Sequence, residues 1–186
     1  MFWPVYWRWP LINCYLHMHN MKFLIIGLLL FLSFAVNGQE SKQFVIEGKV
    51  KAPLTVTLDN LSAYKSVSLD SMTIFNHLMQ RKSSMKNIKG VLLKDILAKV
   101  EIDAASPKTL SEYYLVFTAT DNYKVVYSWN EIFNSPTGNQ VLVLTGYDTN
   151  PAKAEKGNIA IITPSDFATG RKFVKGLSKI SILQVN

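Results

Sequence analysis

The chain has 186 residues, with 20 lysines and arginines, 13 aspartates and glutamates, and a single cysteine. Residues 1–38 hold two of the basic residues, Arg8 and Lys22, and no acid, so residues 39–186 carry a net charge of +5. The lysines are scattered and form no basic stripe, which argues against a nucleic-acid-binding protein. This length predicts one domain.

The N-terminal region has the order of segments that is typical of an export signal. A short positive segment, Met21-Lys22, precedes the apolar run Phe23–Val36, which is short for a membrane span, and Val36-Asn37-Gly38 fits a cleavage site. We therefore predict a signal peptide over residues 21–38 and an exported chain, periplasmic or secreted, that begins at Gln39 and has no transmembrane span. Residues 1–20 fit upstream sequence from a misplaced start codon, an extended n-region, or a membrane-interface element.

The cysteine and histidine content limits the chemistry of the exported chain. Cys14 precedes the predicted cleavage site, so disulfides and thiolate ligands are excluded after cleavage. His77 is the only histidine after residue 38, and one imidazole does not make a metal site. The sequence also lacks the G-x-S-x-G, P-loop and G-x-G-x-x-G motifs. We therefore predict no metal ligand from the protein.

The first half of the exported chain predicts strands and one amphipathic helix. Leu93, Ile96, Leu97 and Val100 have helical spacing and predict a helix with one buried face, which follows Gly90. The segments expected before it, in chain order, are a strand at Phe44–Val50, a strand at Leu54–Leu58, a helical turn at Asn60–Tyr64 capped by Asp59, two short strands at Lys65–Leu69 and Ser71–Phe75, and a basic loop at Leu78–Lys89. That loop is either a solvated loop or a surface that faces an anion.

The second half predicts further strands. Tyr113–Thr120 is a continuous apolar run, and Tyr123–Trp129 follows the turn signal Asp121-Asn122, which predicts a hairpin. A short helical turn is expected at Trp129–Phe133 and a buried strand at Gln140–Thr145. The predicted fold class is therefore α+β, with a mixed β-sheet in one domain over residues 39–186.

Three patterns along the chain resemble a known family. They comprise Gly48, Val50, Pro53, Leu54, Leu58, Asp59 and Leu61, then Gly90, Val91, Leu93, Asp95, Ile96 and Leu97, and last Gly157, Pro164, Val174, Lys175, Leu177, Ile180 and Ile182. Together they resemble the oxidoreductase molybdopterin-binding domain, which is the middle domain of sulfite oxidase and its bacterial relatives. The resemblance covers nearly all of the exported chain.

The resemblance also implies where a cofactor would bind. In the family a cysteine at a strand end ligates molybdenum, but here the matching residues are Phe75-Asn76-His77. Lys175 matches a basic residue that holds the pterin phosphate, although Gly176 stands where the family has tryptophan. The implied cofactor-binding residues are Asn76, His77, Arg171 and Lys175. Without the resemblance, His77 is a strand-end histidine and Gly170–Lys175 a basic surface turn.

Two functions follow as hypotheses. The first is a molybdopterin-dependent oxidoreductase with a redox protein partner, or a degenerate descendant that still binds a pterin. The second is a non-catalytic binding domain for a small anionic ligand or a protein partner. Both expect Phe75–His77 and Gly170–Lys175 to converge on one pocket.

Overall fold

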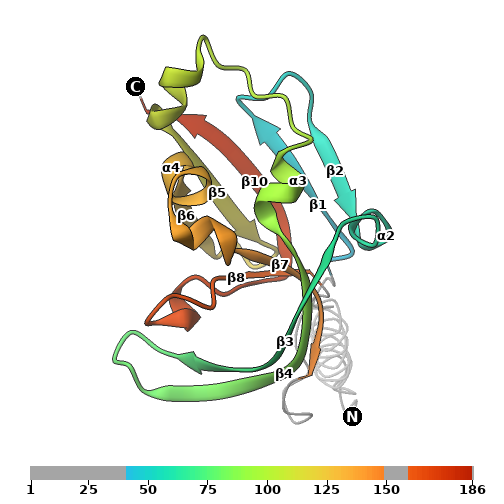
Figure 1. Cartoon of the computed structure of the whole chain (residues 1–186), viewed down its shortest axis with the longest axis vertical. Coiled ribbons are helices and arrows are strands. Elements are labelled where there is room, and N and C mark those ends of the chain that lie inside the picture. The colour runs from blue at the N-terminus through green and yellow to red at the C-terminus, as the bar shows by residue number, and fades with distance from the viewer. Residues whose placement is uncertain (1–40, 149–158, 186) are drawn as a thin grey trace, which may run out of the picture. The chain divides into compact units, whose positions relative to one another are not determined.

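The structure of the chain is a computed structural model that describes residues 41–148 and 159–185 (Figure 1). The predicted signal peptide at residues 21–38, Cys14 and Gly157 lie outside these residues. No helix in the described part is long and apolar enough to cross a membrane.

The described strands form two five-stranded sheets. Sheet A has the order β2-β1-β10-β5-β6 and consists of β1 (Gln43–Gly48), β2 (Leu54–Thr57), β5 (Tyr113–Ala119), β6 (Lys124–Ser128) and β10 (Leu177–Gln184). Sheet C has the order β3-β4-β7-β8-β9 and consists of β3 (Ser66–Phe75), β4 (Arg81–Leu92), β7 (Leu142–Asp148), β8 (Ala160–Ile162) and β9 (Val174–Lys175). β1 and β10 pair in parallel and the other neighbours are antiparallel, so sheet A is mixed.

Short helices connect the strands. They are α2 (Leu58–Leu61), α3 (Leu93–Leu97) and α4 (Trp129–Phe133), with 3-10 turns η2 (Pro107–Glu112), η3 (Pro136–Asn139) and η4 (Thr169–Arg171). This combination confirms the predicted α+β class and the hairpin of β5 with β6.

β8 and the first half of β7 are buried on both faces. Val143 of β7 and Ile161 of β8 belong to the larger apolar cluster, which also contains α3 and the inner residues of sheet A. Leu144 and Ile162 point the other way, into a second cluster with Met85 and Ile88 of β4. Burial on both faces explains why these strands are continuous apolar runs in the sequence and not alternating ones.

The predicted amphipathic helix is confirmed in its buried face but not in its length. Leu93, Ile96 and Leu97 are buried with at most 2% of their surface exposed. The helix ends at Leu97, and Val100 follows in a turn, where it packs partly buried against the same cluster.

The predicted basic loop at Leu78–Lys89 is wrong, because most of it belongs to β4. Its inward residues Met85 and Ile88 are three apart, which hides the period of two that marks a strand. A bulge causes this spacing: Asn87 has a φ of 50°, and the pairing of β4 with β7 shifts between Lys86 and Lys89.

Two smaller predictions are also corrected. The residues expected to form two short strands form the single strand β3, which pairs with β4 on both sides of Asp70. The first helical turn begins one residue after Thr57, whose side chain accepts a hydrogen bond from the Asn60 backbone, so Thr57 and not Asp59 is the N-cap.

Gly90 of β4 has a steric role that can be tested. A Cβ atom there would lie 2.7 Å from the Val143 carbonyl oxygen, whereas one at Gly146 of the neighbouring strand would meet nothing within 4 Å. We expect Gly90→Ala to lower the free energy of unfolding by about 1–3 kcal/mol, because the two backbones must separate. Gly146→Ala is the matched control, with no loss expected. Chemical denaturation measures both, and equal values would contradict the steric role.

Candidate functional site

The Asn76 side chain forms hydrogen bonds within the turn that joins β3 to β4. Its side-chain oxygen accepts hydrogen bonds from the backbone N–H groups of Leu78 (3.0 Å) and Gln80 (2.9 Å). Its amide nitrogen donates to the Gln80 side chain at 3.0 Å. The Asn76 side chain therefore stabilises the turn.

The end of β3 and the 3-10 turn η4 are in contact, although about 95 residues separate them in the chain. The Thr169 hydroxyl accepts a hydrogen bond from the Phe75 N–H at 3.0 Å and donates to the Thr73 carbonyl at 3.2 Å. A Cβ atom at Gly170 would lie 2.8 Å from the Phe75 carbonyl oxygen. Gly170 thus permits close packing on β3.

The structure brings these two segments together, but it leaves the side chains at issue exposed. His77 lies in the turn after Asn76, Arg171 ends η4 and Lys175 ends β9, and all three are exposed. Lys175 places its ammonium group 5.0 Å from the centre of the Phe173 ring. Their assignment to a cofactor stays a prediction.

A cavity lies at another place in the described part of the chain. It has a volume of about 150 Å³ and lies where α2 approaches β4 and β7. Its lining consists of Leu58, Leu61, Ser62, Tyr64, Ser66, Val91 and Thr145, with no charged side chain.

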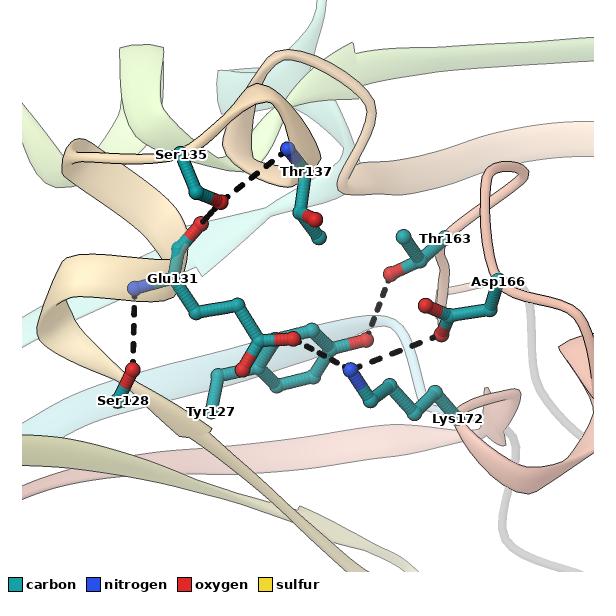
Figure 2. Close-up of polar contacts among 8 residues, drawn as sticks. All are labelled: Tyr127, Ser128, Glu131, Ser135, Thr137, Thr163, Asp166 and Lys172. Atoms are coloured by element: carbon teal, nitrogen blue, oxygen red, sulfur yellow. Dashed lines mark hydrogen bonds and ion pairs between the residues drawn. The ribbon is translucent and has the colours of Figure 1, made fainter.

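A polar cluster of Tyr127, Glu131, Thr163, Asp166 and Lys172 links the two sheets (Figure 2). The Lys172 ammonium group lies 2.5 Å from Glu131 and 3.7 Å from Asp166, and 4.5 Å from the centre of the Tyr127 ring. The three charged side chains are between 21% and 27% exposed, so solvent reaches them. One cation between two carboxylates leaves the cluster with a formal charge of −1.

Local structure positions each member of this cluster. Tyr127 is on β6, and Glu131 is on α4, where the Ser128 side chain caps the helix by accepting a hydrogen bond from the Glu131 N–H. Thr163 follows β8 and lies 2.7 Å from the Tyr127 hydroxyl. The Asp166 N–H donates to the Thr163 carbonyl, which forms the turn that directs Asp166 toward Lys172.

Burial controls the ionisation of two of these groups. It raises the pKa of the Tyr127 hydroxyl well above its ordinary value, although the hydrogen bond with Thr163 lowers it, so Tyr127 is a neutral phenol at physiological pH. Burial also raises the pKa of Asp166, which Lys172 lowers and Glu131 raises further. One oxygen of Asp166 is buried and accepts no hydrogen bond, in agreement with this direction.

Most of the cluster was not recognisable from the sequence. Asp166 reads equally as a pocket acid or a turn residue, since aspartate is common in turns. Lys172 belongs to the basic segment Gly170–Lys175, but its neighbours Arg171 and Lys175 are the exposed members. Glu131 of α4 and Lys172 are 41 residues apart in the chain, and only the fold brings them together.

The raised pKa of Asp166 predicts a pH dependence of stability. The folded chain holds this proton more tightly than the unfolded chain, so the contribution is fully present below the ordinary pKa of 3.8 and is lost as the pH rises through the folded-state pKa. We expect the wild type to lose more unfolding free energy than Asp166→Asn over this rise. Denaturation at a series of pH values measures this, and parallel curves for wild type and Asp166→Asn would contradict it.

Comparisons with known proteins show a likeness in fold. No protein-family model matches the sequence, and no curated protein matches it. Among solved structures, the crystal structure of the sulfane dehydrogenase SoxCD from Paracoccus pantotrophus matches with a TM-score of 0.56 and 14% identity. The match covers 80% of this chain and 39% of that chain, so this chain corresponds to less than half of that protein. At this identity the likeness shows the fold alone.

Proposed function

We propose that the domain is a relative of the sulfite oxidase molybdopterin-binding domain that binds a small phosphate-bearing anion without redox catalysis. The fold likeness to a sulfane dehydrogenase supports the ancestry. The three collinear sequence patterns support it independently. Because a fold does not determine an activity, the choice between catalysis and binding rests on the residues themselves.

The chemistry of the residues in the turn after β3 argues against a molybdenum centre. In the family this strand end supplies the metal-ligating cysteine, whereas here the Asn76 side chain bonds to Leu78 and Gln80 within the turn. His77, the next residue, is exposed. An amide used for a turn and an exposed imidazole do not replace a thiolate, which donates charge to a metal far more strongly. The residues at this place therefore do not fit the metal.

The segment from η4 to β9 supports anion binding. The Tyr123 hydroxyl donates to the Arg171 carbonyl at 2.5 Å and so fixes the backbone at Arg171. The exposed guanidinium of Arg171 offers a planar fork of donors, which suits a phosphate group, and Lys175 adds a second exposed cation four residues later. Lys172, between them, turns inward to Glu131 and is already neutralised.

Binding of inorganic phosphate and of a pterin phosphate tests this assignment. We expect Arg171→Ala and Lys175→Ala each to weaken binding by about 1.5–3 kcal/mol, the usual value of a hydrogen bond to a charged group. His77→Ala should leave phosphate affinity nearly unchanged, and Lys108→Ala, at an exposed lysine of η2, is a charge-matched control. Calorimetric titration measures all four variants. Unchanged affinity in both Arg171→Ala and Lys175→Ala would reduce the segment to a surface turn.

Protein purified from its native host tests the loss of redox chemistry and the predicted export together. We expect molybdenum far below one atom per chain, because the strand end offers the metal no thiolate. The same sample should begin near Gln39 on N-terminal sequencing, since residues 21–38 fit a signal peptide. Stoichiometric molybdenum would overturn the non-catalytic assignment, and an intact Met1 or Met21 would overturn the export prediction.

A further inference from the structure

The turn between β3 and β4 presents two large apolar side chains to solvent. Leu78 is 62% exposed and Met79 is 52% exposed. Figure 1 shows this turn at the far end of the β3–β4 hairpin. The Asn76 side chain accepts hydrogen bonds from the N–H of Leu78 and from the N–H of Gln80, the residue after Met79. The turn that presents the two side chains therefore has a defined conformation.

A third exposed apolar side chain belongs to the segment that packs against the same end of the hairpin. Phe167 is 86% exposed. It lies two residues before Thr169, whose hydroxyl is bonded to the Phe75 N–H, and Phe75 is three residues before Leu78. Exposure of these apolar side chains to water costs free energy. Such exposure is common where a protein contacts an apolar phase.

Unpaired positive charge follows the apolar turn. The segment Leu78–Lys89 contains four cations and no acid, and these are Arg81, Lys82, Lys86 and Lys89. Within residues 41–148 and 159–185 none of the four forms a salt bridge. All four are exposed. The bulge at Asn87 accounts for two of them, because it turns Met85 and Ile88 inward and Lys86 and Lys89 outward.

We propose that the β3–β4 turn docks on an anionic lipid surface. Leu78 and Met79, with Phe167 beside the hairpin, enter the region between headgroups and acyl chains, while Arg81 and Lys82 contact lipid phosphates. An apolar tip next to basic residues is the pattern of proteins that bind membrane surfaces, because burial of apolar area and attraction to anionic headgroups act together.

The size of the tip favours a lipid surface over a protein partner. A stable protein–protein interface buries roughly 1,200–2,000 Å² and has a packed apolar centre. Leu78 and Met79 are two side chains on a narrow turn, and the cavity described above lies elsewhere, at α2. A bilayer accepts such a tip because its interface yields to the side chains that enter it. This inference uses residues other than Arg171 and Lys175, so it stands or falls separately from the proposed function.

A fluorophore at the turn gives a local test in the full chain, and a dye at a second position controls for vesicle binding through residues 1–40. Leu78→Cys in a Cys14→Ser background is labelled with an environment-sensitive dye and mixed with vesicles of phosphatidylcholine alone or with phosphatidylglycerol. We expect a blue shift only with the anionic vesicles, reversed by high salt. Val126→Cys, labelled at an exposed apolar residue of β6, is the matched control and should show no shift.

Charge removal and tip removal complete the test. Arg81→Gln and Lys82→Gln should each weaken the apparent vesicle affinity by about fivefold, the effect expected for one basic residue near an anionic surface. Met79→Ser, with the dye at position 78, should weaken it with both charges in place. A dye at position 78 that does not respond to anionic vesicles would overturn the proposal. So would a response that is equal at position 126, or one that is unchanged in both glutamine variants.

Discussion

Burial of β8 and of the first half of β7 on both faces is the constraint on which the rest of the domain depends. Val143 and Ile161 face the cluster shared with sheet A, and Leu144 and Ile162 face the second cluster. Since apolar burial supplies most of the stabilising free energy of a folded domain, these two strands determine where everything else can pack. The position of Thr163, directly after β8, and therefore of the polar cluster, follows from this arrangement.

The polar cluster is the electrostatic counterpart of that apolar centre. Lys172 lies between Glu131 and Asp166 and over the Tyr127 ring, and so connects the β8–β9 segment to β6 and α4 (Figure 2). Glu131 and Asp166 are partly buried carboxylates that both lie within 4 Å of the Lys172 ammonium group. Such carboxylates repel each other unless a cation lies between them, so Lys172 compensates both. The inward direction of Lys172 has a consequence for its neighbours: it anchors the segment that carries Arg171 and Lys175 outward.

The residues at the end of the β3–β4 hairpin differ in chemistry from those that the family resemblance implies. A strand end that would supply a metal-ligating thiolate instead forms a hydrogen-bonded turn around Asn76, with an exposed apolar tip. Next to it, Thr169 bonds to the edge of β3 and brings a second basic segment close. The exposed cations near this turn are the feature on which the proposed binding of anionic groups rests.

The sequence by itself determined the fold class, the buried face of α3 and four strands of sheet A, which are β1, β2, β5 and β6, because alternation, apolar runs and helical spacing reflect burial locally. The resemblance also placed Phe75 and Gly170 in neighbouring segments, and the structure brings them into contact. Only the tertiary structure decided that residues 81–92 form a strand, since the bulge at Asn87 interrupts the alternation. It also decided which basic residue of Gly170–Lys175 turns inward, because the partners of Lys172 come from α4 and from the turn after β8. Contacts between residues so far apart leave no periodic pattern in the chain, so packing in three dimensions had to reveal them.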